Sequence, residues 1–394
     1  MVAATPTRME APLIPAIAAM TGLQVIVSMA LFAPGVLAPK LGLSELDLGV
    51  YATLCFLTGV LVSLGAGKLT NRLGSFAVAA LCMAIVATAM GLAATATPLG
   101  LAAAGIVIGF AFGLETPASS ALLGVLVRPD QRALVFSIRQ SGNQFGAVAG
   151  SALLPAIAIY SAVAGYGLVA AIAGLGFIVF LKMLSGYDPL TKGAATGQNF
   201  VAALKLFRST SSLWRLGWAT VPYVVLQMSL NTFLVTHAVT TLGRDHVSAG
   251  LLLATAQFGG LIGRLGWGVV ASRWVETRAV IASLGIAMGV FGVTLANADA
   301  TWSWLPLASL CFVFGLTASG WNGIFLAEVA RLAPEGRIAE ATGAVLVASY
   351  SGLVLGPLAV AGLAALGGLS LAYAVFGLLA GLAGLFLFLT GRRP

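Results

Sequence analysis

Charge is scarce in this chain of 394 residues, in which Asp, Glu, Lys and Arg together make up 8% and only 12 residues are acidic. Histidine and cysteine are also rare, with 2 and 3 residues, and Cys55, Cys82 and Cys311 have neither metal-site nor redox spacing. The chain lacks a Gly-x-Ser-x-Gly elbow, a phosphate-binding loop and a histidine pair at ligand spacing. We therefore expect no metal, no cofactor and no catalytic residue, and so no enzyme.

Most of the chain is apolar. Hydrophobic residues make up 59% of the chain and the mean hydropathy is +1.03, far outside the range of soluble domains. Runs of roughly 20 apolar residues, each long enough to cross a bilayer as a helix, recur along the whole length. This pattern predicts an all-α integral membrane protein with twelve transmembrane helices, over residues 12–37, 46–66, 76–95, 99–126, 132–158, 164–184, 214–240, 247–270, 279–298, 303–330, 338–365 and 369–390.

The net charge of +8 does not point to nucleic acid, because the basic residues are sorted along the chain. Outer loops would hold only Lys40 and Arg244, and Arg139 and Arg264 fall inside predicted helices. By the positive-inside rule this sorting predicts an even number of spans with both termini in the cytoplasm. The inner segments carry the other 16 basic residues: Arg8, Lys68, Arg72, Arg128, Arg132, Lys182, Lys192, Lys205, Arg208, Arg215, Arg273, Arg278, Arg331, Arg337, Arg392 and Arg393.

The spans divide six and six around a polar stretch. We predict an N-terminal bundle over residues 1–184, a cytoplasmic linker over 185–213 and a C-terminal bundle over 214–394. The linker is expected to hold either an interfacial helix or a simple tether. The two halves carry similar residues at corresponding positions: Gly67 and Arg72 correspond to Gly268 and Arg273 at an offset of 201. Parallel repeats of six helices are a known plan in membrane transporters.

The segment GKLTNRLGS, residues 67–75, resembles the loop motif of the major facilitator superfamily, Gly-x-Leu-x-Asp-Arg-x-Gly-Arg-Arg or Lys. Asn71 stands where the family has Asp, and Ser75 and Ser272 replace other charged positions, which weakens the expected ion pairs. The resemblance implies two six-helix pseudo-repeats, transport by alternating access and a monomer. It also implies a cytoplasmic gate, whose residues here would be Gly67, Asn71, Arg72, Gly74, Arg273 and Glu328.

Arg264 would lie about 13 Å above the inner loop, at nine residues from Arg273. A charge at this depth is costly and usually faces a cavity or a partner. The sequence around it, Gly263 to Gly268, is similar to helix 8 of the oxalate and monocarboxylate branches of the superfamily, where an arginine binds the substrate carboxylate. A guanidinium suits that work because its planar fork matches a carboxylate. The alternative is an arginine that pairs with a helix end or an acid.

Two further charges fall within the spans. Arg139 lies about 10 Å into its helix and shares a face with Asn143, so we expect this face to line the cavity or the contact between the halves. Both residues are candidates for substrate binding. Glu115 lies roughly 20 Å from the inner loop, and two interpretations stay open: a proton-coupling carboxylate, or a static partner of Arg139. Glu328 is expected to form a salt bridge at the gate. Other candidates for substrate hydrogen bonds are Gln24, Tyr223, Gln227, Asn231, Trp321 and Asn322.

These features favour a secondary transporter for a small organic anion, a carboxylate, moved in symport with protons. The alternative is a drug or metabolite efflux antiporter of the same fold, whose Gly-x-x-x-Gly-Pro-x-x-Gly-Gly motif is only partly present: Gly142, Gly146 and Gly150 keep the spacing, and Ala147 replaces the proline. The expected partners are an anionic small molecule, protons and the lipid bilayer, and the expected location is a bacterial inner membrane.

Overall fold

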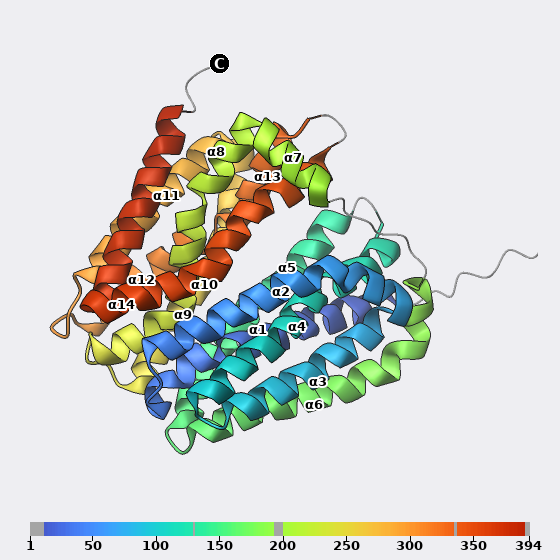
Figure 1. Ribbon diagram of the computed structural model, residues 1–394, viewed down its shortest axis with the longest axis horizontal. Helices are drawn as coiled ribbons and strands as arrows, with labels where there is room; N and C mark the ends of the chain where they lie inside the picture. The colour runs from blue at the N-terminus through green and yellow to red at the C-terminus, as the bar shows by residue number, and fades with distance from the viewer. Residues whose placement is uncertain (1–11, 129–130, 193–199, 335–336, 391–394) are drawn as a thin grey trace, which may run out of the picture.

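A computed structural model describes residues 12–128, 131–192, 200–334 and 337–390, and this part of the chain is helical (Figure 1). The chain termini, residues 1–11 and 391–394, lie outside it. The α-helices are α1 (Leu13–Leu41), α2 (Glu45–Leu73), α3 (Ser75–Ala93), α4 (Pro98–Leu126), α5 (Arg132–Ala158), α6 (Ala162–Tyr187), α7 (Phe200–Ser209), α8 (Ser211–Ala219), α9 (Val221–Thr240), α10 (His246–Arg273), α11 (Thr277–Ala296), α12 (Trp304–Ala318), α13 (Asn322–Leu332) and α14 (Ile338–Thr390).

The all-helical membrane architecture predicted from the sequence is confirmed. Ten helical stretches in the described residues are long and apolar enough to span a membrane. One of them lies in α14, which joins two helices across Gly367 and Gly368, where the backbone leaves helical geometry. The more polar helix α5 is not among the ten. The count of twelve transmembrane helices therefore stays a prediction.

Two predicted spans are interrupted in the structure. The span expected over 303–330 breaks between α12 and α13, because the chain at Ser319 and Gly320 leaves the helix. A Cβ on Gly320 would lie 2.6 Å from the ring of Trp267, so this close approach requires glycine. The span expected over 214–240 begins earlier, at α8, and is divided at Thr220, just before Pro222 in the first turn of α9.

The linker predicted over 185–213 is helical in its second part. Helix α7 packs against α14 and α8 rather than forming a free tether. The ring of Phe207 is buried and lies 4.9 Å, centroid to centroid, from the ring of Trp214. Burial of such an apolar face ties the end of the linker to the C-terminal bundle.

The helices form two bundles, α1–α6 and α8–α14. We call the side where α1 begins and α14 ends the termini side, and the opposite side the far side. The bundles meet mainly through three helix pairs, α1 with α9, α2 with α14, and α5 with α10, and α2 with α9 and α1 with α10 make smaller contacts. In Figure 1 they converge at the lower left, on the far side, and diverge toward the termini side.

Close contacts between the bundles lie on the far side. A Cβ on Gly35 of α1 would lie 2.7 Å from the carbonyl oxygen of Thr232 in α9. A Cβ on Gly49, at the start of α2, would lie 2.7 Å from the Cβ of Ala361 in α14. Only glycine lets two helices approach so closely, as small residues do in membrane interfaces. The structure therefore shows the state in which the far side is closed.

The bundles repeat one internal contact. Gly142 and Gly146 of α5 face α1, where a Cβ on Gly146 would lie 2.2 Å from the carbonyl oxygen of Val25. Gly352 and Gly356 of α14 face α9 in the same manner, with contacts to Val221 and Val225. The glycine spacing of four residues, seen in both halves of the sequence, thus serves the same helix packing in both bundles.

Candidate functional site

Arg139 and Glu115 lie together between α5 and α4. Both side chains are buried, at 3% and 4% exposure. Arg139 donates to Ser119 Oγ, and Ser119 Oγ donates in turn to the carbonyl oxygen of Glu115 at 2.8 Å. Among the described residues no ion pair joins the arginine to the glutamate. The structure therefore places these charges close together without the direct contact that a static pair would make.

Each of these two side chains has a buried polar atom with no hydrogen bond. Glu115 Oε1 accepts from Thr116 Oγ1 at 2.9 Å, but its Oε2 has no partner in the described part of the chain. Arg139 Nε is likewise without one. Unsatisfied polar groups in a buried site are costly, and such groups often mark function. The free carboxylate oxygen is a position where a proton can bind.

Arg264 extends from α10 to the break between α12 and α13. Its Nε donates to the carbonyl oxygen of Ser319 at 3.2 Å, at the C-cap of α12. The predicted alternative, an arginine at a helix end, is thus part of what the structure shows. The same side chain is half-buried, and its two Nη groups make no hydrogen bond with the described residues. These Nη groups remain available to a ligand.

A chain of amide side chains joins the two bundles at mid-depth. Gln144 of α5 donates from Nε2 to Gln257 Oε1 of α10 at 3.2 Å. Gln257 donates from its own Nε2 to Asn231 Oδ1 of α9 at 2.8 Å. All three side chains are buried. Asn231 was predicted as a site residue, whereas Gln257 was not, because a single amide in an apolar helix gives no periodic signal.

The packing of α5 on α10 fixes the relative level of the two arginines. The helices run in opposite directions, since α5 starts on the termini side and α10 ends there. Gln144 lies opposite Gln257, and a Cβ on Gly260 would lie 2.6 Å from Gln144 Nε2. Arg264 is one helical turn beyond Gly260 and Arg139 about one turn before Gln144. Both arginines therefore lie just on the termini side of the amide chain, one in each bundle.

Several of the other predicted residues make polar contacts nearby. Ser28 Oγ of α1 lies 2.7 Å from Asn143 Oδ1 of α5, and the buried Gln24 has an Oε1 with no partner in the described chain. Asn322 donates to Gln227 Oε1 at 3.4 Å, between α13 and α9. These contacts keep polar atoms of both bundles near the centre of the molecule.

Tyr223 and Trp321 lie elsewhere, inside the C-terminal bundle. Tyr223 is fully buried and donates to the carbonyl oxygen of Ile281 in α11 at 3.3 Å. Its ring packs edge-on against that of Trp321, with centroids 5.7 Å apart. Trp321 donates to the carbonyl oxygen of Ala318, one turn earlier in the chain. Both therefore serve packing within one bundle in this state.

The predicted gate residues lie at the termini side. Gly67 and Asn71 are half-buried in α2, Arg72 is exposed near its end, and Arg273 is the exposed last residue of α10. In the described residues neither arginine forms an ion pair with the other bundle. This agrees with bundles that stand apart on this side. Gly74 has a local role: its φ of +100° turns the chain into α3.

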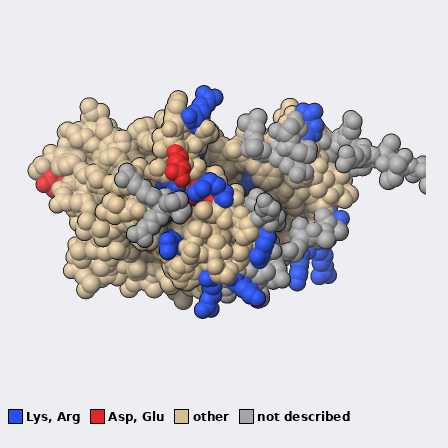
Figure 2. Space-filling model, turned by 90° about the horizontal axis from the view of Figure 1, so that it is seen from above, with Lys and Arg blue, Asp and Glu red and all other residues tan. Residues whose placement is uncertain are grey.

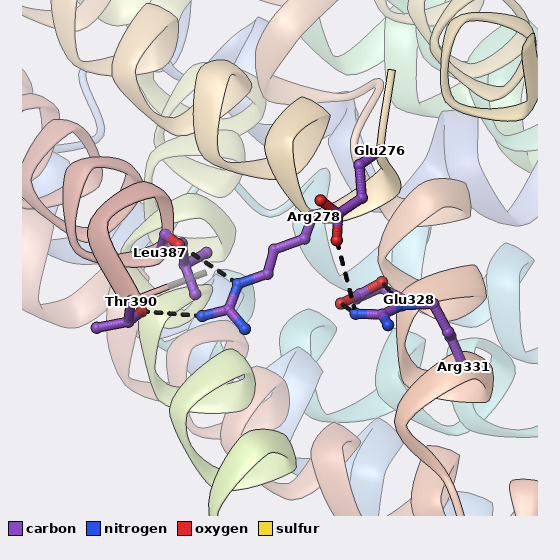
Figure 3. Close-up of polar contacts among 6 residues, drawn as sticks. All are labelled: Glu276, Arg278, Glu328, Arg331, Leu387 and Thr390. Atoms are coloured by element: carbon purple, nitrogen blue, oxygen red, sulfur yellow. Dashed lines mark hydrogen bonds and ion pairs between the residues drawn. The ribbon is translucent and has the colours of Figure 1, made fainter. Parts of the chain in front are cut away.

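Glu328 forms a salt bridge, as the sequence predicts, but with a residue of its own helix. Arg331 reaches both carboxylate oxygens of Glu328 at 2.7 and 2.8 Å, and its Nη2 lies 4.0 Å from Glu276 (Figure 3). The carboxylate of Glu328 is fully buried. This cluster joins α13 to the start of α11 within the C-terminal bundle.

The surface on the termini side is basic. Figure 2 shows Lys and Arg side chains gathered there, with few Asp or Glu. The sorted charge of the sequence thus appears as one basic face of the folded molecule. Such a face is the pattern of the cytoplasmic side of membrane proteins.

Two helical bundles that meet on the far side, with buried charges at mid-depth, define the class of the protein, a helical integral membrane protein. The profile of the Major Facilitator Superfamily matches residues 16–357. The chain therefore belongs to this superfamily.

Two curated relatives are similar to part of the chain. The chain is 26–27% identical over 220 residues to uncharacterized MFS-type transporters of Mycobacterium tuberculosis, covering 55% of this chain. It spans about half the length of these curated relatives, 48%.

Two solved transporters share the fold. A variant of the nucleoside transporter NupG superposes with a TM-score of 0.80 at 15% identity, covering 96% of this chain and 99% of that one. A POT family transporter in complex with 5-aminolevulinic acid gives 0.74 at 12% identity, covering 95% of each chain. At these identities the likeness concerns the fold alone.

Proposed function

We propose that this protein moves a small organic anion, a carboxylate, across the membrane by alternating access and in symport with protons. The observation that carries the proposal is the position of Arg139 and Arg264 at one level, one in each bundle, next to the amide chain of Gln144, Gln257 and Asn231. Two cations at the place where the bundles part create a positive region that favours an anion over a cation.

Arg264 is the substrate-binding arginine of this proposal. Its Nε holds the end of α12 through Ser319, which fixes the plane of the guanidinium. A carboxylate can then accept from the two Nη groups, as in the fork-to-fork geometry that arginine and carboxylate prefer. The bond to Ser319 is thus compatible with ligand binding, because it orients the group and leaves the remaining donors unused.

Glu115 is the proton-binding group of the proposal. Its Oε2 is buried and without a hydrogen bond, and Arg139 lies close enough for an electrostatic interaction. When Glu115 holds a proton, the positive charge of Arg139 is free to attract an anion. When Glu115 loses the proton, its carboxylate competes for the same cation. Proton and substrate binding are coupled in this way by one shared arginine.

The basic termini side supports an orientation with both termini in the cytoplasm (Figure 2). A monomer in the inner membrane of a bacterium belongs to the same proposal. Efflux of a drug or metabolite by proton antiport is the second candidate, supported by Gly142, Gly146 and Gly150 of α5, which pack on α1. The sign of the charge at mid-depth favours the anion symporter.

The test is uptake of labelled mono- and dicarboxylates into proteoliposomes under an inward proton gradient. We expect one carboxylate to accumulate. Arg264→Ala should lower its kcat/KM at least 100-fold, because a lost charged hydrogen-bond pair costs on the order of 3 kcal/mol. Arg264→Lys, which keeps the charge without the fork, should recover only part of this. Glu115→Gln should retain exchange of substrate and lose the response to the gradient.

Arg208→Gln serves as a matched control, since it removes one exposed arginine on the termini side. It should transport as the wild type does. Normal carboxylate uptake by Arg264→Ala would leave this arginine with the structural role at Ser319 alone. A protein that moves no carboxylate and expels organic cations instead would establish the efflux function.

A further inference from the structure

A groove of about 300 Å³ lies on the outside of the C-terminal bundle, between α8 and the last part of α14. It is separate from the central site, because the residues that line it come from α8 and the last part of α14 alone. Two tryptophans line it and keep 41% and 43% of their surface exposed. The residues around it are Trp214, Arg215, Trp218, Ala219, Ala383 and Phe386.

The groove has a polar end and an apolar end. Helix α8 enters the membrane from the termini side and leads into α9, so Arg215 lies nearer the membrane surface than Ala219. Helix α14 ends on the same side at Thr390, so Ala383 lies deeper than Phe386. The arginine therefore stands at the surface end of the groove and the alanines at the deep end. Tryptophans commonly lie at this level, where headgroups meet acyl chains.

A second arginine stands at the surface end. Arg278 of α11 donates from Nη2 to Thr390 Oγ1 at 2.9 Å and from Nε to the carbonyl oxygen of Leu387 at 3.3 Å (Figure 3). Ala383, Phe386 and Thr390 follow one another at steps of three and then four residues, which places them on one face of α14. Among the described residues neither Arg215 nor Arg278 has an acidic partner. The surface end of the groove thus carries uncompensated positive charge.

We propose that this groove binds a phospholipid with an anionic headgroup from the leaflet on the termini side. The lipid phosphate accepts hydrogen bonds from Arg215, whose planar fork matches phosphate geometry, and Arg278 adds charge beside it. The tryptophan rings flank the glycerol and ester region. One acyl chain lies along Phe386 toward Ala219 and Ala383. Basic pockets between membrane helices are suited to such headgroups.

The proposal is tested by native mass spectrometry of the full chain in detergent, titrated with dioleoylphosphatidylglycerol or dioleoylphosphatidylcholine. The first phosphatidylglycerol should bind the wild type about fivefold more tightly than phosphatidylcholine. Arg215→Gln should remove this preference, and Arg215→Lys should retain most of it. Arg208→Gln, which removes one exposed charge from the neighbouring α7, should leave the preference unchanged.

Equal binding of the two lipids by the wild type would overturn the proposal. So would an equal loss of preference in Arg208→Gln and Arg215→Gln, since diffuse surface charge would then account for the binding.

A second measurement locates the lipid without relying on the arginine variants. Brominated phosphatidylglycerol should quench tryptophan fluorescence more than brominated phosphatidylcholine, and this excess should vanish when Trp214 and Trp218 are both replaced by Phe. Excess quenching that survives the double replacement would place the lipid elsewhere.

Discussion

Gly74 shows how one residue can be essential for a reason that its motif does not state. Its φ of +100° lies in the region that side chains avoid. A Cβ at this position would also lie 2.2 Å from Asp188 Cγ. The motif around Gly74 predicted a gate, whereas the structure gives this glycine a role in bringing α3 against the end of α6.

We predict that Gly74→Ala strongly destabilises the protein. The backbone strain alone is on the order of 1–3 kcal/mol, and the contact with Asp188 adds to it. Thermal unfolding in detergent measures the effect. Gly65→Ala is the matched control, because its Cβ would meet nothing within 4 Å in helix α2, and it should leave the unfolding temperature unchanged or raise it. Equal unfolding temperatures for the two variants would contradict this account.

At the same scale, the sequence identified charged residues better than amides and aromatics. Arg139, Arg264 and Glu115 stood out because a charge in an apolar span is rare. Gln257 did not, although its side chain bonds to Asn231 within the C-terminal bundle and to Gln144 of the N-terminal bundle. Tyr223 shared a helical face with Gln227 and Asn231 in the sequence, but its long side chain reaches α11 instead. The direction in which a side chain packs depends on neighbours that a single sequence does not reveal.

At the scale of elements, the start of α3 depends on a distant part of the chain. Asp188, just after α6, accepts hydrogen bonds from the backbone amides of Phe76 at 2.6 Å and Ala77 at 3.1 Å. Helix starts attract negative charge because their first amides lack partners. In the other bundle Arg278 of α11 binds the carbonyl oxygen of Leu387 near the end of α14. The pair α3 and α6 is thus joined by an acid at the start of α3. The corresponding pair of the other bundle, α11 and α14, is joined by a base near the end of α14.

We predict that Asp188→Ala costs about 2 kcal/mol, at the upper end of what caps contribute, because the carboxylate is buried. Asp188→Asn, which keeps one acceptor oxygen, should cost less. Thermal unfolding again gives the ranking. Asp245→Ala removes a cap that also accepts from two amides, those of Val247 and Ser248, at an exposed position, so its effect should be smaller. A cost for Asp188→Ala no greater than that for Asp245→Ala would refute the importance of burial.

The breaks in the helices were harder to predict than the helices themselves. Composition and length were sufficient to predict an all-helical membrane protein, because hydrophobicity decides whether a segment enters the bilayer. The break between α12 and α13 depends on Gly320 packing on Trp267 and on Arg264 binding Ser319. These partners lie about 55 residues away along the chain. Tertiary contacts of this kind leave no local pattern in the sequence.

At the scale of the whole molecule, the two bundles are in contact on the far side and apart on the termini side (Figure 1). Transport by alternating access requires the reverse arrangement as well, so the far-side contacts must separate in each cycle. The glycine contacts of α1 with α9 and α2 with α14 have no charged partners. Their separation therefore breaks packing contacts and exposes small residues, without the cost of separating ions.

We predict that a covalent bond across the far side stops transport. In Gly49→Cys combined with Ala361→Cys, the two Cβ positions start 2.7 Å apart, and a shift of about 1 Å reaches disulfide geometry. Cys55, Cys82 and Cys311 form no disulfide, so a mild oxidant should join the introduced pair, whose two positions are in contact. Uptake into proteoliposomes should fall to background after oxidation and return after reduction, while each single variant ignores the oxidant. Full transport by the cross-linked protein would show that α2 and α14 stay together throughout the cycle.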